Sequence, residues 1–177
     1  MSPIRPYAGV LPRLGERVYV DPQACVIGRV EIGADSSVWP MTVIRGDVNF
    51  IRIGARTSVQ DGAVLHVVHE GAPGSGGLPL VVGDDVTIGH KAVLHACTIG
   101  NRCLVGMGAI VLDGAEVGDE VIIGAGCLVP PRKRLPSRTM WVGNPARQLR
   151  ELTEAEIAGL RYSAAHYVRI KDQYRGA

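Results

Sequence analysis

Aliphatic residues recur along most of the chain at steps of six residues, with occasional fives, and many of them are followed by glycine. The aliphatic-glycine pairs are Ile27-Gly28, Ile32-Gly33, Ile53-Gly54, Val82-Gly83, Ile88-Gly89, Ile99-Gly100, Val105-Gly106, Val117-Gly118 and Ile123-Gly124. A six-residue unit of one short strand and one turn cannot bury its own aliphatic residue, but stacked units cover one another. The pattern therefore predicts an all-β fold, a parallel β-helix of hexapeptide repeats, from about residue 27 to residue 129.

The repeat stops before the C-terminus. Residues 130–150 carry several prolines and predict an extended exit segment, and Thr153-Glu154-Ala155-Glu156 is a capping box that opens a helix to about residue 174. One stripe of that helix is apolar and should pack along the coils: Ile157, Leu160, Ala164, Val168 and the stem of Lys171. We therefore divide the chain into a hexapeptide-repeat β-helix domain at 1–150 and a C-terminal α-helix at 151–177 packed on it.

The composition agrees with a narrow aliphatic interior, since 23 Gly and 11 Pro accompany one Phe and two Trp. A net charge of +2, spread along the chain, marks no nucleic-acid-binding face, and no apolar run is long enough to span a membrane. The first residues match neither a secretory signal nor a transit peptide, so we expect a cytoplasmic location. Each cysteine precedes an aliphatic position by two residues and should point inward as a small buried hydrophobe: Cys25, Cys97, Cys103 and Cys127.

A glycine-rich insertion at 69–77 interrupts the repeat and predicts a protruding loop. Without it, His66 stacks on His95 in the next coil, and Asp61 stacks on His90. Adjacent coils lie about 4.8 Å apart, so two outward imidazoles in register can share one metal ion. The spacing therefore predicts a metal site at His66 and His95.

His90 precedes His95 by five residues, which separates their Cα atoms by up to about 16 Å in extended chain, with a corner between them. His90 would then complete the site of a neighbouring subunit, and such head-to-tail contacts around a three-sided coil close into a homotrimer. His69 and His166 fit no such position, and we expect them on the loop and on the helix surface.

Polar residues break the repeat at two further places, Arg45-Gly46-Asp47 and Gln60-Asp61, and we expect them to cluster near the metal face. An intersubunit salt bridge from Arg45 to Asp61 or Asp47 is a structural alternative that is compatible with a catalytic role.

These motifs, together with Leu65-His66 and the pair His90 and His95, resemble the signature of the gamma-class carbonic anhydrases and their bacterial homologues over nearly the whole chain. The resemblance implies a left-handed coil and a zinc ion, replaceable by iron or cobalt, bound by His66 and His95 of one subunit and His90 of the next. It implies a lyase that reversibly hydrates carbon dioxide to bicarbonate through a metal-bound hydroxide. In that reading Gln60 orients the hydroxide, while Arg45, Asp47 and Asp61 organise the interface.

The sequence departs from the prototype of that family where protons would leave the site. Val48 follows Asp47 in place of a glutamate, and the loop offers only Glu70 as an acidic residue. Glu70, His69 and Tyr167 are candidates for the proton shuttle, and Arg45 could favour the developing anion. Tyr167 matches a family tyrosine that reaches the metal pocket, although packing against the coils is an equal alternative.

Two other functions stay open. A hexapeptide acyltransferase has the same coil and the same exit motif, here Val142-Gly143-Asn144-Pro145-Ala146, but needs a single basic histidine and acyl coenzyme A. A catalytically weak, metal-stabilised trimeric scaffold would keep the metal without the activity.

Overall fold

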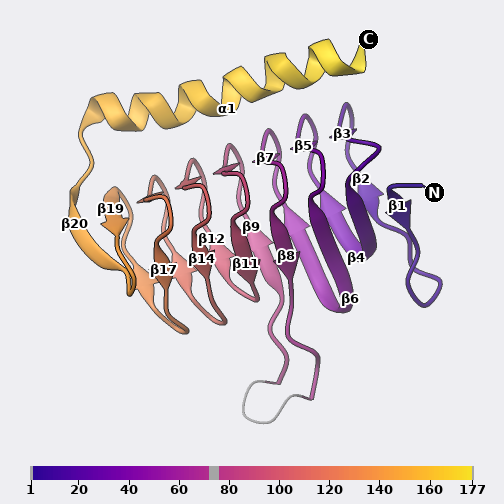
Figure 1. Cartoon of the computed structure of the whole chain (residues 1–177), viewed down its shortest axis with the longest axis horizontal. Helices are drawn as coiled ribbons and strands as arrows, with labels where there is room; N and C mark the ends of the chain where they lie inside the picture. Colours follow the sequence, from indigo (N-terminus) through magenta and orange to yellow (C-terminus); the bar gives the residue numbers. More distant parts are fainter. Residues whose placement is uncertain (1, 72–75, 177) are drawn as a thin grey trace.

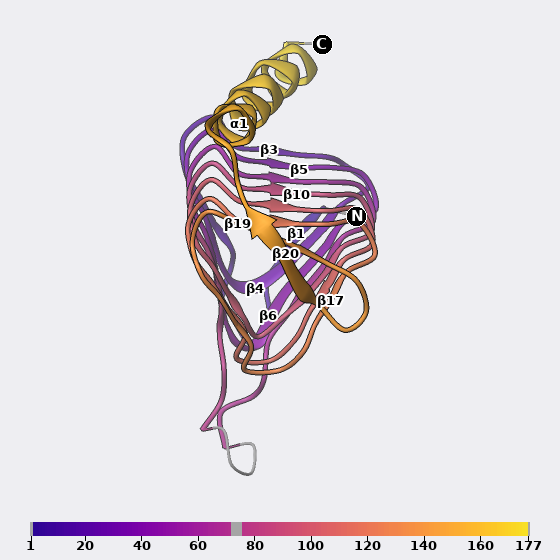
Figure 2. The ribbon, with the colours of Figure 1, turned by 90° about the vertical axis from the view of Figure 1, so that its left-hand side faces the viewer.

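Short parallel strands joined by tight turns wind the chain into a stack of triangular coils (Figures 1 and 2). The computed structural model describes residues 2–71 and 76–176, and these form a left-handed parallel β-helix of about seven turns followed by a C-terminal helix. The predicted fold class is confirmed. Residues 72–75 of the predicted insertion lie outside the described residues.

One face of the coil is a sheet that lies beneath the C-terminal helix, and we call it the helix-covered face. Its strands follow the order of the coils and are parallel except for the last one, which runs antiparallel to β19. They are β3 (Tyr19–Val20), β5 (Ser37–Val38), β7 (Ser58–Val59), β10 (Thr87–Ile88), β13 (Leu104–Val105), β16 (Ile122–Ile123), β19 (Thr139–Val142) and β20 (Arg147–Glu151).

The other two faces are joined into one sheet, because the long strands β4 (Cys25–Ile32) and β6 (Val43–Ile53) run across both. The second face continues from the first half of β6 through β8 (Val64–His66), β11 (Val93–His95), β14 (Ile110–Val111) and β17 (Leu128–Val129). The third face continues from the second half of β6 through β9 (Leu80–Val82), β12 (Thr98–Ile99), β15 (Glu116–Val117) and β18 (Arg134–Leu135). At the N-terminal end β1 (Ile4–Arg5) and β2 (Arg13–Leu14) pair with β4.

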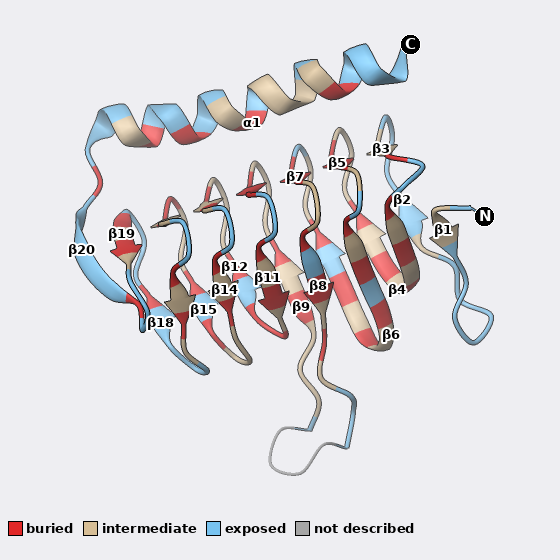
Figure 3. Cartoon of the chain, in the orientation of Figure 1, coloured by how far each residue is buried: buried red, intermediate tan, exposed pale blue. Residues whose placement is uncertain are grey.

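Stacked aliphatic residues fill the interior, one from each face of each coil (Figure 3). Ile44, Leu65 and Leu94 illustrate one such column, and each is fully buried. Burial of a side chain of this size contributes about 1.5–3 kcal/mol, so repetition of the coil supplies the core that its few aromatic residues do not.

The coil is longer at both ends than the repeat at 27–129 predicts. Leu135 and Trp141 continue the six-residue step beyond Val129, are buried, and lie on strands parallel to the preceding coil. Most of the segment 130–150 is therefore coil rather than an extended exit, and only β20 leaves it.

The first predicted position is also shifted by one residue. Val26 is fully buried while Ile27 is half-buried, and this turns Cys25 partly outward, where its sulfur contacts the guanidinium of Arg5. The prediction of an inward cysteine is thus wrong for Cys25 and confirmed for Cys97, Cys103 and Cys127.

One corner of the triangle carries charges of alternating sign, and we call it the charged corner. Its residues all adopt a left-handed conformation, with φ between 52° and 62°. They are Arg17, Asp35, Arg56, Asp85, Arg102, Glu120 and Arg138. Ion pairs connect neighbouring coils, as between Arg17 Nε and Asp35 Oδ1 at 2.9 Å and between Arg102 Nε and Glu120 Oε1 at 3.0 Å. Because basic and acidic residues alternate from coil to coil, each charged side chain at this corner is stacked next to side chains of opposite charge.

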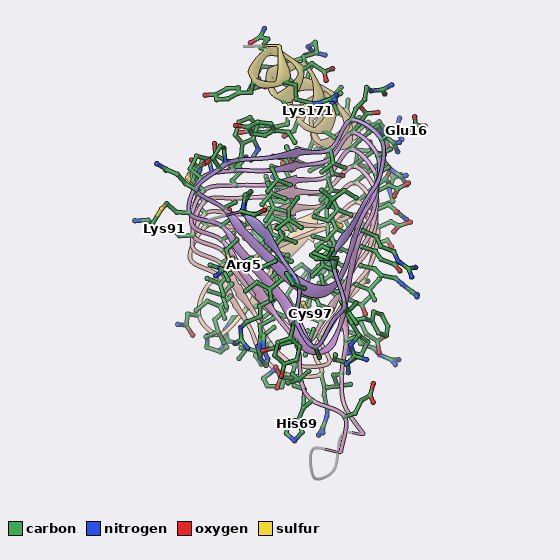
Figure 4. All side chains as sticks on the ribbon, turned by 90° about the vertical axis from the view of Figure 1, so that its right-hand side faces the viewer. Arg5, Glu16, His69, Lys91, Cys97 and Lys171 are labelled. Carbon is green, nitrogen blue, oxygen red and sulfur yellow. The ribbon has the colours of Figure 1, made fainter. Side chains whose placement is uncertain are left out.

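The helix α1 (Glu154–Arg175) runs back along the coils from the last to the first (Figure 1). Its Thr153 capping box forms as predicted, and Ile157 and Leu160 pack on the helix-covered face. Lys171 is fully buried, charge included, because its Nζ lies 3.0 Å from Asp35 Oδ1 at the charged corner (Figure 4). No helix in the described part of the chain combines the length and hydropathy needed to cross a bilayer.

Candidate metal centre

His66 and His95 lie side by side at the ends of two neighbouring strands. They are paired in register between β8 and β11, as the sequence predicts, and the register across the insertion is thereby confirmed. His66 Nδ1 lies 3.2 Å from His95 Nε2, and the two side chains are 20% and 33% exposed. One nitrogen of each ring therefore points at the other ring, on the outside of the coil.

A carboxylate binds the second nitrogen of each ring. Asp47 Oδ1 lies 3.1 Å from His66 Nε2, and Asp113 Oδ1 contacts His95 Nδ1. An ionised carboxylate only accepts hydrogen bonds, so these two nitrogens carry the protons of the neutral rings. The facing nitrogens, His66 Nδ1 and His95 Nε2, are then both unprotonated, and a shared cation would relieve the repulsion between their lone pairs. This donor set fits a metal ion such as zinc.

Burial favours the form of His66 that can bind a metal. Desolvation lowers its pKa below the usual value, and the charge of Arg45 adds to this effect, while the hydrogen bond to Asp47 opposes it. Burial acts to raise the pKa of Asp47, but hydrogen bonds from His66, Arg45 and the Val48 N–H outweigh it and hold that pKa low. A neutral imidazole thus lies beside an ionised carboxylate.

Gly46 separates Arg45 from Asp47 on β6, at a point where two coils approach each other closely. A Cβ on Gly46 would lie 2.6 Å from the carbonyl oxygen of Arg29 in the preceding coil, so only glycine allows this approach. The residues on either side point to the same side of the strand, and the Arg45 guanidinium donates to Asp47. Of the two predicted partners of Arg45, the structure pairs it with Asp47 within the chain.

His90 and Gln60 belong to a second group, on the other side of a corner. His90 Nδ1 lies 2.9 Å from Asp61 Oδ2, which confirms the predicted stacking of these residues. His90, Gln60 and Tyr167 line a groove of about 400 Å³ between α1 and the helix-covered face. Lys91, with φ of +58°, forms the corner that separates His90 from β11.

The expectation that all the polar residues cluster near one metal face is therefore wrong for a single chain. Arg45 and Asp47 accompany the His66–His95 pair, whereas Gln60 and Asp61 accompany His90. Figure 4 shows the separation, since Lys91 and Cys97, which follow His90 and His95 closely in the chain, lie at different corners. Within residues 2–71 and 76–176, no group of three or more His, Cys, Asp or Glu side chains is arranged to hold a metal ion.

The candidates for proton transfer lie in different places. Tyr167 is half-buried, with its ring edge-on to Trp39 at a centroid distance of 6.3 Å, so it both packs on the coils and lines the His90 groove. Glu70 is largely exposed and pairs with Arg29 at 3.7 Å. His69 lies on the protruding loop, and His166 stacks on Tyr162.

Sequence reasoning missed Asp113. Spacing alone does not identify it, because β11 and β14 pair at an offset of 17 residues, Leu94 with Val111, whereas Asp113 follows His95 by 18 and lies in the turn after β14.

Comparison with known proteins identifies relatives along nearly the whole chain. The family model described as "Bacterial transferase hexapeptide (six repeats)" matches residues 96–131. "Protein YrdA" of Escherichia coli is 54% identical over 97% of this chain and 93% of its own length. "Carbonic anhydrase" of Geobacillus kaustophilus is 41% identical over 97% of this chain and 90% of its own length. "Gamma carbonic anhydrase 2, mitochondrial" of Arabidopsis thaliana is 44% identical over 90% of this chain and 57% of its own length.

Two solved structures share the fold at comparable identity. A hexapeptide transferase family protein from Anaplasma phagocytophilum superposes with a TM-score of 0.89 at 41% identity, covering 97% of both chains. A Bacillus cereus protein described as a candidate acetyltransferase superposes with a TM-score of 0.90 at 39% identity, covering 98% of this chain and 96% of its own.

Proposed function

The chain belongs to the hexapeptide-repeat family of gamma carbonic anhydrases and their homologues, and we propose that it binds zinc at the interfaces of a homotrimer and reversibly hydrates carbon dioxide to bicarbonate there. The observation that carries the proposal is the His66–His95 pair, in which two imidazole nitrogens face each other at 3.2 Å while a carboxylate binds the far side of each ring.

His66 and His95 of one subunit and His90 of its neighbour would hold the metal. A zinc ion held by neutral imidazoles supplies a Lewis acid and a water whose pKa is lowered to about 7. Iron or cobalt suits the same nitrogen ligands. Asp61 binds Nδ1 of His90, so His90 too has one free nitrogen, Nε2, to offer across an interface.

The outward side chains on the second face support the trimer. From β6 to β17 they form an unbroken apolar column beside the histidine pair, and we call this surface the apolar face: Val43, Val64, Val93, Ile110 and Leu128. The corresponding column on the third face is mostly charged, with Glu31, Arg52, Glu116 and Arg134 among its members. A subunit interface on the apolar face would remove exposed hydrophobic surface and bring a neighbour to the metal pair.

The chain's own residues account for the remaining steps. Gln60 is 5% exposed and lines the groove beside His90, and its amide would hold the attacking water by a hydrogen bond. The groove beside it has an apolar wall that includes Leu104, Met107 and Ile122, which suits an uncharged carbon dioxide molecule. The Arg45 guanidinium would attract the bicarbonate anion, and Tyr167, Glu70 or His69 would pass the released proton to solvent.

An acyltransferase is the second candidate, because the matching family model is a transferase and the Bacillus cereus relative is described as a candidate acetyltransferase. Such an enzyme needs no metal. A metal-stabilised scaffold without activity is the third candidate. Metal analysis, stopped-flow hydration of carbon dioxide with and without a proton-shuttling buffer, and an acetyl coenzyme A turnover assay separate the three.

Subunit mixing tests the shared site. His90→Ala and His95→Ala trimers should each lose the metal, while His166→Ala, changed on the outer face of α1, should keep about one per subunit. Coexpression of the two defective chains should restore metal at about a quarter of the sites, since an intact pair on one chain then meets an intact His90 on the other. Failure of coexpression to restore any metal would contradict an interfacial site.

A further inference from the structure

Asp113 is held in place by the backbone of three successive coils. It lies in the turn that follows β14, whose Val111 is paired with Leu94. The Arg132 N–H donates to the Asp113 carbonyl at 2.9 Å, and the N–H of the next residue, Gly114, donates to the Ala96 carbonyl at 2.7 Å. The turn thereby delivers a carboxylate directly to the ring of His95.

The contact decides which nitrogen of His95 is free. Asp113 Oδ1 binds Nδ1, while Nε2 lies 3.2 Å from His66 Nδ1. The neutral ring has one proton, and the carboxylate keeps that proton on Nδ1 because it can only accept. Without Asp113 the proton could occupy Nε2, where it would block the nitrogen that faces His66.

We propose that Asp113 is a positioning residue that fixes His95 in the Nδ1-protonated form and aims its Nε2 lone pair at the shared metal position. The metal in this inference rests on the proposed function, whereas the protonation pattern of His95 does not. Asp113 acts through His95 and does not itself touch the metal or the substrate.

The other two histidines show the same arrangement. Asp47 binds the ring nitrogen of His66 that faces away from His95, and Asp61 binds Nδ1 of His90. All three carboxylates come from a coil adjacent to that of their histidine, Asp47 and Asp61 from the coil before and Asp113 from the coil after. Stacking of coils thus supplies both the ligands and the groups that orient them.

The test compares Asp113→Asn with Asp119→Asn. Both substitutions remove one negative charge from a carboxylate of similar exposure, 42% for Asp113 and 45% for Asp119. Asp119, however, lies next to Glu120 of the charged corner and contacts Asn101 and Arg102 rather than a histidine. Zinc affinity measured by chelator competition should fall about 10- to 100-fold in Asp113→Asn and stay at the wild-type value in Asp119→Asn. Asp113→Glu, which keeps the charge and the acceptor, should recover part of the loss.

A second readout needs no metal. In the metal-free full-length protein labelled with ¹⁵N-histidine, NMR should find His95 protonated on Nδ1 in the wild type, and the pattern should change in Asp113→Asn. Wild-type zinc affinity in Asp113→Asn, or protonation of Nε2 in the wild type, would overturn the inference. If the wild type bound no metal, the proposed function would fail, and the NMR result would still decide the role of Asp113.

Discussion

Gly46 allows two coils to approach closely beside Arg45 and Asp47, and Gly46→Ala tests this close approach directly. The new Cβ would lie 2.6 Å from the Arg29 carbonyl oxygen and 3.2 Å from Val30 Cγ2. Ordinary contacts of this kind begin near 3.4 Å, so the two coils must separate by about 0.8 Å at this point. Because the contact atom is backbone within a paired strand, no side-chain rotation can relieve it.

Overpacking of this kind costs about 1–3 kcal/mol. For a chain of this length each kcal/mol lowers the melting temperature by roughly 2–4 °C, so we expect a decrease of about 2–12 °C. Gly159→Ala is the matched control: nothing lies within 4 Å of a Cβ there, and the position is inside α1. Removal of a helical glycine should stabilise the protein by about 0.5–1 kcal/mol.

The measurement is unfolding by heat and by guanidinium at one fixed protein concentration, in the presence of chelator. Fixed concentration matters because association shifts the apparent stability, and the chelator removes any contribution from bound metal. Zinc affinity should also fall in Gly46→Ala, since Arg45 and Asp47 move with the strand. Equal stability of Gly46→Ala and wild type would refute the close-approach argument.

Three further predictions concern other parts of the molecule. The hydrogen bond from Arg17 lowers the pKa of Asp35 to about 2, so its stabilisation is complete above about pH 4 and is lost as the pH falls towards 2. Asp35→Asn should cost about 3 kcal/mol at pH 7 in chemical unfolding, because the buried Lys171 ammonium then keeps only Asp172 as a charged partner. The substitution should also flatten the acid loss, and an unchanged acid profile would contradict this. Val93→Asp should dissociate the proposed trimer in sedimentation, whereas Thr98→Asp on the third face should not, and a trimeric Val93→Asp protein would exclude the apolar face as the interface. In thiol titration of the native protein, only Cys25 should react, because the other three cysteines are buried. All four should react after unfolding. Reaction of more than one cysteine per native chain would contradict the buried positions.

The register of the coil could be predicted from the sequence because stacking depends only on residue spacing. His66 with His95 and Asp61 with His90 follow once the insertion is removed, since hydrogen bonds between adjacent coils fix which residues are neighbours. The ends of the coil were less accessible. At the C-terminal end, the aromatic residue Trp141 occupies a position that the repeat otherwise fills with an aliphatic residue. At the N-terminal end, Val26 and Ile27 are both aliphatic, so the sequence does not show which of them points inward.

Contacts across a corner could not be predicted in the same way. Gln60 is six residues from His66 in the chain, yet it lines the groove of His90 and Tyr167, because a turn at Gly62, with φ of +68°, separates it from β8. The ion pair between Lys171 and Asp35 was also missed. The apolar stripe of the helix indicates that the Lys171 stem is buried, but it does not indicate which carboxylate of the coils faces the ammonium group. Residue spacing therefore predicts which residues are neighbours within one face. It does not predict which residues of different faces come together, because the turns and α1 determine this.

The charged corner links the stability of the coil to the geometry of the groove. Arg161 of α1 binds Glu120 at 3.4 Å, and Lys171 binds Asp35 at 3.0 Å, so the helix is fixed to the corner at two points. Tyr167 lies between these points, where its ring lines the groove and packs edge-on against Trp39. The charged corner therefore contributes both to the contacts between neighbouring coils and to the attachment of the helix that carries Tyr167. Tyr167 precedes Lys171 by about one helical turn and shares its side of α1, so the Lys171–Asp35 contact helps to hold this candidate for proton transfer against the groove.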